Sequence, residues 1–216
     1  MKDKRIEELS ILKEEKYLSL YDATYKNKKG DTKHWTIASR KKYEILKEQI
    51  FNDREEKQDA VVIVAYNIDQ KKLVFIRQFR IPLNDYVYEL PAGLIDGDES
   101  MEISTIRELK EETGMDVIDI NYNKTKRAIY ASAGMTDESF SMVYCTCRGD
   151  ISYDYLEDDE DIEVVLVSKE EAMELIAGNG SAANGAAESA IAAIKFDVKA
   201  YLILQSFALL GERMIE

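Results

Sequence analysis

The sequence predicts a fold that combines α-helices and β-strands, of the α+β or α/β class, preceded by a small N-terminal β-hairpin subdomain. Two observations support this prediction. Alternating, aromatic-rich runs flank a turn within residues 17–40, as in a hairpin. From residue 59 onward, apolar strand-like runs are interspersed with segments of helical spacing. We therefore expect a hairpin subdomain over residues 1–57 and a larger domain with its own core over residues 58–216.

The N-terminal elements follow from turn and charge patterns. The sequence KNKKGD, residues 26–31, contains residues that β-turns favour, so we expect one hairpin strand on each side of it. The residues before position 17 form a short charged start. Residues 41–58 are mostly polar, and we expect a connector there.

The strands of the larger domain are expected where apolar residues run together. Residues 59–69 and 71–81 form two such runs around a turn, and the first is nearly all apolar, as in a strand buried on both faces. A short strand, VYEL, ends at Pro91. Further strands are expected at residues 126–132, 139–147 and 162–168.

Capping signals predict three helices. The first runs from about residue 100 to 113 and ends at Gly114, a natural C-cap. The second begins at Ser168, which matches a capping box with Glu171, and the last covers residues 197–210. The residues of the first helix that we expect to pack on the sheet are Ile103, Ile106 and Leu109.

Composition excludes several classes of partner. The net charge of −13 argues against nucleic acid and anionic membranes. No apolar run reaches membrane-spanning length, and the N-terminus lacks the apolar middle of a signal peptide, so we expect a cytoplasmic protein. Cys145 and Cys147 point to the same face of one strand, and we interpret them as reduced packing residues. Residues 178–193 are almost all small and are expected to form a loop running into a weak helix.

One segment, residues 93–115, gathers acidic side chains on a single helix face. Glu108 and Glu112 are four residues apart and Glu111 is three from Glu108, so they are neighbours on the helix surface. Carboxylates about 4 Å apart repel by roughly 4 kcal/mol per pair at an effective dielectric of about 20. A divalent cation removes this cost, and oxygen ligands favour Mg²⁺ or Mn²⁺ over zinc. The alternative is a solvated helix face with Arg–Glu pairs.

Two further residues suit a metal site. Arg107 can hold one glutamate in place. Gly93 lets the backbone turn sharply, so that the carbonyl of Ala92 can join the ligands. The predicted metal ligands are Ala92, Glu108, Glu111 and Glu112.

The same segment resembles the signature of the Nudix hydrolases, G-x5-E-x7-R-E-U-x-E-E-x-G-U, in which U is aliphatic. Five residues separate Gly93 from Glu99, and seven separate Glu99 from Arg107. The remaining positions are filled by Glu108, Leu109, Glu111, Glu112, Gly114 and Met115. The resemblance implies an α/β/α sandwich with a mixed β-sheet, and cleavage of a nucleoside diphosphate linked to another group.

Short motifs outside this signature resemble the ADP-ribose and ADP-sugar pyrophosphatase branch. They lie at residues 32–40, 78–80, 89–93, 130–138 and 195–200. The resemblance implies Mg²⁺-dependent hydrolysis of ADP-ribose, or of a related nucleoside diphosphate sugar, to AMP and a sugar phosphate. The substrate-binding residues it implies are Trp35, Arg40, Arg80, Glu89, Leu94 and Ser132.

The resemblance also implies how some of these residues act. Trp35 would stack on the adenine from a partner subunit, in a homodimer with exchanged N-terminal hairpins. Arg80 would neutralise the diphosphate, a role that suits a fixed guanidinium in an acidic protein. Thr36 departs from the pattern, because relatives often have an acidic residue there. The resemblance therefore supports diphosphate cleavage more strongly than adenine selectivity.

The branch places its general base, a glutamate, on a loop before the strand that precedes the capping-box helix. Glu160 aligns best with that glutamate, and its neighbours Asp159 and Asp161 are substitutes. Crowded carboxylates raise one another's pKa toward values useful in proton transfer. The predicted catalytic residues are Glu160, Glu111 and Arg107.

Three alternatives differ in function. The first is the same chemistry on another nucleoside diphosphate sugar. The second is a Nudix-fold regulator that binds ADP-ribose or a nucleotide sugar without turnover, although such proteins often lose signature glutamates and this chain keeps them all. The third is a structural protein in which the acidic helix simply forms part of the surface.

Overall fold

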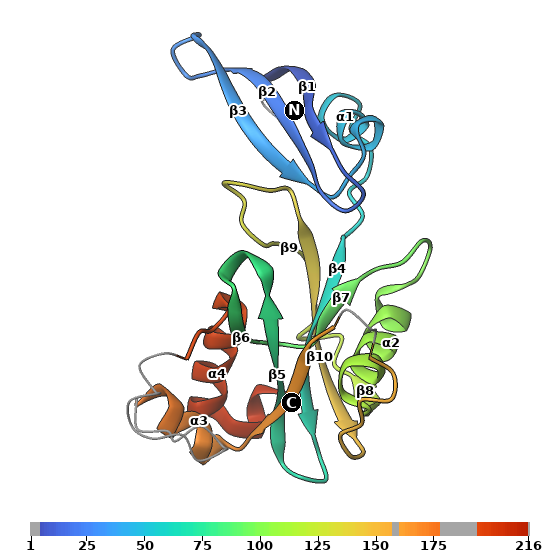
Figure 1. Ribbon diagram of the computed structural model, residues 1–216, viewed down its shortest axis with the longest axis vertical. Coiled ribbons are helices and arrows are strands. Elements are labelled where there is room, and N and C mark those ends of the chain that lie inside the picture. The colour runs from blue at the N-terminus through green and yellow to red at the C-terminus, as the bar shows by residue number, and fades with distance from the viewer. Residues whose placement is uncertain (1–4, 157–159, 178–193, 216) are drawn as a thin grey trace. The chain divides into compact units, whose positions relative to one another are not determined.

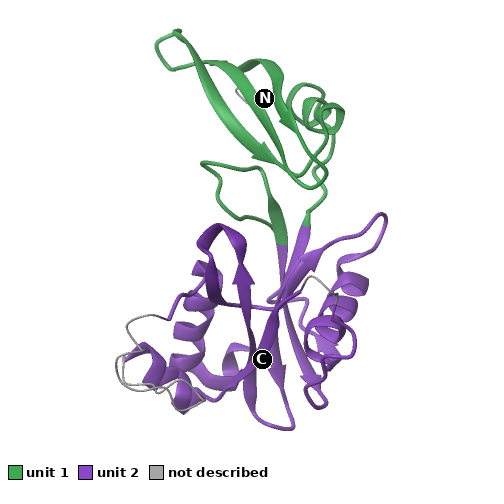
Figure 2. Cartoon of the chain, viewed as in Figure 1, with its two compact units in different colours: residues 1–59, 127–140 green, residues 60–126, 141–216 purple. Residues whose placement is uncertain are grey.

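The computed structural model (Figure 1) describes residues 5–156, 160–177 and 194–215. The predictions for Asp159 and for residues 178–193 fall outside these ranges. Figure 2 shows the chain divided into two compact units. The first comprises residues 1–59 and 127–140, and the second comprises residues 60–126 and 141–216.

The first unit is built on a three-stranded antiparallel sheet. Its strands are, in order, β1 (Ile6–Glu14), β2 (Ser19–Lys26) and β3 (Thr32–Ser39). Strands β2 and β3 confirm the predicted hairpin, and Gly30 takes a positive φ of 87° in its turn. The core of this unit consists of Leu9, Tyr21, Ala23 and Leu46.

Two elements of the first unit differ from the sequence prediction. The prediction of a connector at residues 41–58 was wrong, because the helix α1 (Tyr43–Phe51) forms there and buries Leu46. Tyr43, Leu46 and Ile50 recur at helical spacing and pack on the sheet, although polar residues surround them. The charged start forms β1, an edge strand in which only Leu9 is buried, so alternation is barely visible in its sequence.

The larger, mixed sheet has eight strands. Its main path runs β11 (Ile162–Val167), β5 (Lys72–Arg80), β4 (Ala60–Asn67), β10 (Ser139–Arg148) and β8 (Asp116–Ile120). Three short strands branch from it, β6 (Asp85–Glu89) from β5, β7 (Ala92–Leu94) from β4 and β9 (Lys126–Tyr130) from β10. Strands β7 and β8 were not predicted, whereas the other strands of this sheet lie where the apolar runs indicated.

Helices cover both sides of this sheet. Helix α2 (Met101–Thr113) lies on one side, and α3 (Lys169–Ile176) and α4 (Val198–Leu210) lie on the other (Figure 1). Short 3₁₀ turns, η1 (Ile81–Leu83) and η3 (Gly211–Met214), complete the described elements. This arrangement confirms the expected sandwich. None of the described helices is long and apolar enough to cross a membrane.

Strands β4 and β5 separate soon after the turn that joins them, and this opens a place for the site. They pair only at Tyr66–Leu73 and Asn67–Lys72. Beyond that point β7 pairs with β4, and β6 pairs with β5. The short segment from β6 to β7 is thereby held between two central strands, directly before α2.

The ends of α2 agree with the predicted signals. The Ser100 side chain accepts a hydrogen bond from the Ile103 N–H, and Gly114 ends the helix in the left-handed region with φ of 78°. The buried face differs from the expected one. Leu109 is buried, but Ile103 and Ile106 are 55% and 52% exposed, so the prediction that both pack on the sheet was wrong. The face that carries the glutamates is the one that turns inward.

The two cysteines are free and buried in β10, as expected. Burial raises the pKa of both thiols, that of Cys147 to about 12. They pack in the core beneath α2, near Met115. These thiols are therefore packing groups that stay protonated at neutral pH.

Candidate active site

The centre of the candidate site is a pair of carboxylates on the inner face of α2. Glu108 is 8% exposed and Glu112 is 2% exposed. The Ala92 N–H at the start of β7 donates a hydrogen bond of 3.0 Å to Glu112 Oε2. This bond ties the sheet to the last turn of the helix, and it holds an acidic side chain where solvent hardly reaches.

Residue 93 must be a glycine, because there is no space for a side chain at this position. A Cβ placed on Gly93 would overlap the Glu108 carboxyl group, which lies directly against the backbone of β7. Gly93 is not among the glycines with positive φ and belongs to a strand. The expectation that it permits a sharp turn was therefore wrong. Its missing side chain instead lets the Glu108 carboxylate approach the sheet.

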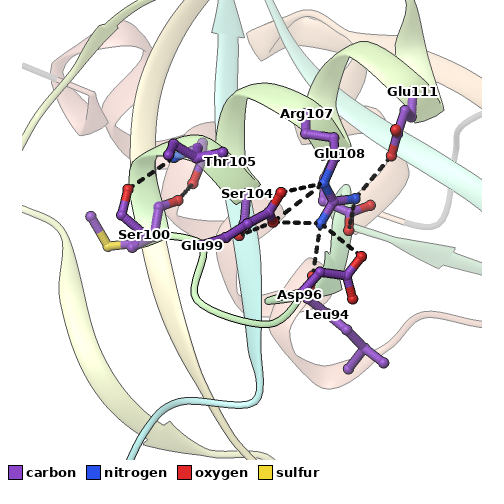
Figure 3. A network of polar contacts seen from close by, with 11 residues as sticks. Leu94, Asp96, Glu99, Ser100, Ser104, Thr105, Arg107, Glu108 and Glu111 are labelled. Carbon is purple, nitrogen blue, oxygen red and sulfur yellow. Dashed lines mark hydrogen bonds and ion pairs between the residues drawn. The ribbon is translucent and has the colours of Figure 1, made fainter.

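Arg107 forms hydrogen bonds with several residues on and just before α2, as Figure 3 shows. Its Nη1 donates to Glu108 Oε1 at 2.7 Å and to Glu111 Oε2 at 3.0 Å. Its Nη2 donates to the Leu94 carbonyl and to Glu99 Oε2, both at 3.0 Å. One guanidinium thus fixes three carboxylates and the end of β7, as a planar fork with several donors can do.

Glu99 anchors this arginine. Its carboxylate also accepts a hydrogen bond of 2.8 Å from Ser104 Oγ, and the Arg107 hydrogen bond is the main reason why the pKa of Glu99 is lowered. Glu99 lies in the loop before α2, so it links that loop to the second turn of the helix. Glu99 is not among the site residues predicted from the sequence, although its spacing of seven residues to Arg107 is a signal for it.

Burial makes the central carboxylates hard to ionise. It raises the pKa of Glu108 to about 7, although Arg107 opposes the shift, and Glu111 and Glu160 add repulsion. The pKa of Glu112 is raised well above its usual value, first by burial and then by the charges of Glu108 and Glu160. A bound cation would lower both pKa values, because an opposite charge favours the ionised form.

The donor chemistry fits a hard divalent cation. Glu108 and Glu112 offer only oxygen ligands, and the single charge of Arg107, which Glu108 shares with Glu99 and Glu111, cannot by itself neutralise both glutamates when they ionise. Across residues 5–156, 160–177 and 194–215, no group of three or more His, Cys, Asp or Glu side chains is arranged as a metal site as it stands. Glu111 is held by Arg107 on a more exposed flank of the helix.

Arg80 and Glu89 pair with each other beside the carboxylates. Arg80 Nε and Nη2 donate to the two Glu89 oxygens at 2.6 and 2.8 Å, across strands β5 and β6. The hydrogen bond to Glu89 raises the pKa of Arg80, and the charge of Glu112 contributes. The Arg80 side chain as a whole remains 43% exposed.

Glu160 lies just before β11, and its charge acts on both buried glutamates of α2. The structure therefore brings this predicted base into electrostatic range of the predicted metal ligands. Asp161 has a different environment, because its carboxylate accepts a hydrogen bond of 2.6 Å from the Tyr86 hydroxyl.

The remaining predicted residues, Trp35, Arg40 and Ser132, lie in the first unit. Trp35 is 53% exposed, and its Nε1 donates to the Gly134 carbonyl at 3.3 Å. Arg40 Nε donates to Glu138. The Ser132 carbonyl accepts hydrogen bonds from the N–H groups of the two residues at 135 and 136.

Trp35 borders a pocket of about 300 Å³ within the first unit. Its other lining residues are Ile37, Tyr130, Ala133, Met135, Thr136 and Asp137. Tyr130 and Met135 were not singled out from the sequence, although both belong to the quoted motif at residues 130–138. The pocket offers an aromatic and apolar surface of the kind that lines small-molecule sites.

Comparison with known proteins agrees with this geometry. The NUDIX domain family matches residues 56–186. A putative nudix hydrolase 2 of Caenorhabditis elegans is 37% identical over 118 residues, which are 51% of this chain and 52% of that protein. The ADP-ribose pyrophosphatase of Bacillus subtilis is 34% identical over 122 residues, which are 54% of this chain and 62% of that protein. The chain thus spans 52% to 62% of the length of these curated relatives.

A solved structure described as an ADP compounds hydrolase shares the fold. It superposes with a TM-score of 0.63 and 16% identity, covering 94% of this chain and 92% of its own. The fold and the carboxylate-bearing helix define a protein of the Nudix type. With the family match over residues 56–186, this chain belongs to the Nudix family.

Proposed function

We propose that this chain hydrolyses the diphosphate linkage of ADP-ribose, or of a related nucleoside diphosphate sugar, with Mg²⁺ or Mn²⁺ as its cofactor. The observation that supports this most is the burial of Glu108 and Glu112 against β7, where their pKa values are raised. Similarity to the ADP-ribose pyrophosphatase of Bacillus subtilis supports the choice of substrate.

The residues that would hold the cation are Glu108, Glu112 and the Ala92 carbonyl, with Glu111 beside them. When bound, a divalent cation would neutralise these carboxylates and stabilise the charge that develops on the diphosphate oxygens. Arg107 keeps Glu108 and Glu111 in place through hydrogen bonds of 2.7 and 3.0 Å. This removes freedom that the side chains would otherwise lose on binding.

The chemistry needs a base and a means to orient the substrate. Glu160 accepts the proton of the attacking water, whose oxygen bonds to one phosphorus while the bridging phosphorus–oxygen bond breaks. The products are AMP and ribose 5-phosphate. Arg80 contacts the diphosphate, and Trp35 stacks on the base.

We also propose a homodimer in which the Trp35 pocket of one subunit serves the carboxylates of its partner. Exposed apolar side chains of the first unit support an interface, among them Ile11, Leu12 and Leu18, which are 48%, 55% and 49% exposed. Activity per chain should fall on dilution as the dimer dissociates. Constant specific activity through dissociation, followed by light scattering, would argue against a shared site.

The proposed function is tested by product analysis. The protein is incubated with Mg²⁺ and a panel of nucleoside diphosphate derivatives, and the products are identified by chromatography and mass spectrometry. We expect AMP and ribose 5-phosphate from ADP-ribose, no turnover in chelator, and recovery when Mg²⁺ is restored. A protein that binds ADP-ribose and leaves it intact would instead be a regulator.

A further inference from the structure

We propose that Tyr86 is a positioning residue for catalysis, which fixes the chain at Asp161 and thereby sets the place of the adjoining Glu160. The proposal rests on the proposed function, in which Glu160 is the general base. It also assigns Asp161 the role of an anchor and removes it from the candidate bases. We call the contact between the Tyr86 hydroxyl and the Asp161 carboxylate the latch.

The latch holds residue 161 from two neighbouring strands. The Tyr86 hydroxyl of β6 donates to Asp161 Oδ2 at 2.6 Å. The Phe79 N–H of β5 donates to the Asp161 carbonyl at 3.1 Å. The paired ladder of β11 with β5 begins one residue later, at Ile162 opposite Gln78. The latch therefore extends the fixed part of the chain to the residue that adjoins Glu160.

The Tyr86 ring is itself held in a fixed orientation. The Arg77 guanidinium lies over it, 4.0 Å from the ring centroid, and Phe79 meets it edge-on at 5.4 Å. Arg77 is in turn paired with Glu163 of β11 at 3.2 Å. A cation over a tyrosine face and an aromatic edge are both attractive contacts. The hydroxyl is thus presented to Asp161 by a ring that cannot turn freely.

The position of Glu160 matters because a base must lie within hydrogen-bond reach of its proton. Its charge already acts on Glu108 and Glu112 across the site. A displacement of about 1 Å at a reacting group can cost up to about a hundredfold in rate. The latch is a side-chain contact one residue from Glu160, directly before the β-ladder begins.

The test compares three variants by steady-state kinetics with ADP-ribose and saturating Mg²⁺. Tyr86→Phe and Asp161→Ala both remove the latch, and each should lower kcat about tenfold with KM changed less than about twofold. Asp161→Asn keeps an oxygen acceptor for the hydroxyl and should retain kcat within about threefold of wild type. The double variant Tyr86→Phe/Asp161→Ala should be no slower than either single variant, because both remove one contact.

Tyr88→Phe is the matched control. Tyr88 lies two residues along the same strand, and its ring contact with Phe196, at 5.3 Å, survives the substitution. This variant should keep both kcat and KM, and thermal unfolding should show that all variants are folded. A merely structural role for Tyr86 would change stability and leave the kcat of folded protein unaltered.

The outcomes separate the two proposals. If wild type hydrolyses ADP-ribose and Tyr86→Phe matches it, the latch proposal is overturned and the proposed function stands. If Asp161→Asn is as slow as Glu160→Gln, Asp161 acts as the base and the anchor role is wrong. If wild type shows no turnover, the proposed function is overturned, and the catalytic role proposed for the latch is overturned as well.

Discussion

Glu108 is the residue at which stability and function oppose each other. It is 8% exposed, and burial raises its pKa from the usual 4.5 to about 7. Ionising it inside the metal-free protein costs free energy that a solvated glutamate would not lose. A glutamate in this buried position is understandable if a bound cation compensates its negative charge while the protein functions.

The first prediction concerns the pH dependence of stability without metal. Between about pH 4.5 and 7, folded Glu108 retains a proton that the unfolded chain has released. The free energy of unfolding therefore falls as the pH rises through this interval, and the contribution is constant above it. Glu108→Gln should flatten that slope, as measured by urea unfolding in chelator at about pH 5 and about pH 8.

Glu174→Gln serves as the control for this measurement. Glu174 is an exposed residue of α3, so its variant should keep the wild-type slope. An equal slope for Glu108→Gln and wild type would show that Glu108 titrates normally in the folded protein.

The second prediction concerns the base. Glu160→Gln should lower kcat about a hundredfold, the usual scale for a general base, with little change in metal binding. The measurement pairs steady-state kinetics with a metal titration of the same variant. If kcat of the variant stays within about threefold of wild type, the base is another residue, and the glutamates of α2 are the next candidates.

The third prediction concerns Gly93. In Gly93→Ala the new methyl group would overlap the Glu108 carboxyl group, so the carboxylate must move away from β7. We expect a lower melting temperature and a loss of kcat of about a hundredfold. Adding Glu108→Ala should recover melting temperature without recovering activity. No recovery in the double variant would mean that the clash lies elsewhere.

At the scale of elements, the site depends on how α2 is joined to β7. Arg107 bonds the Leu94 carbonyl at the end of β7, Glu99 in the loop, and two glutamates of the helix. The loop, the strand and the helix thus share one guanidinium. Their relative position is set by a residue whose several donors act in one plane.

The fourth prediction follows from this geometry. Arg107→Lys keeps the charge but loses the planar fork, so a single ammonium cannot reach all of these partners. We expect kcat to fall at least about tenfold and the melting temperature to drop. Arg148→Lys, at the exposed end of β10, is the control and should behave as wild type. Retention of activity in Arg107→Lys would show that charge alone suffices.

Much of the second unit was predictable from sequence, and the reason lies in its elements. The nearly continuous apolar run of β4 is buried on both faces, and the caps at Ser100, Gly114 and Ser168 fix the ends of α2 and start α3. In the first unit, the charged edge strand β1 and the polar helix α1 were not predicted, because their few buried residues are spaced among exposed ones.

The candidate site was predictable in its residues and not in its orientation. Spacing placed Glu108 and Glu112 on one helix face, and the structure agrees. Ile103 and Ile106, which lie on other faces of the helix, were expected to pack on the sheet, but both are exposed. Only tertiary contacts with Ala92 and Gly93 show why the carboxylates turn inward instead.

For the whole molecule, charge determines what the site requires. The chain carries a net charge of −13, and its proposed substrate is an anion. Arg80 and Arg107, whose charges act on the buried carboxylates, are already paired with glutamates. The proposed function therefore relies on a bound cation and on Arg80 to attract the diphosphate.

The most direct test of this account is a Mn²⁺ titration of chelator-stripped protein, followed by the electron paramagnetic resonance of free Mn²⁺. Wild type should bind the ion, and the double variant Glu108→Gln/Glu112→Gln should bind at least about tenfold more weakly while remaining folded. Equal binding by the two proteins would contradict the claim that the inward face of α2 exists to hold a divalent cation.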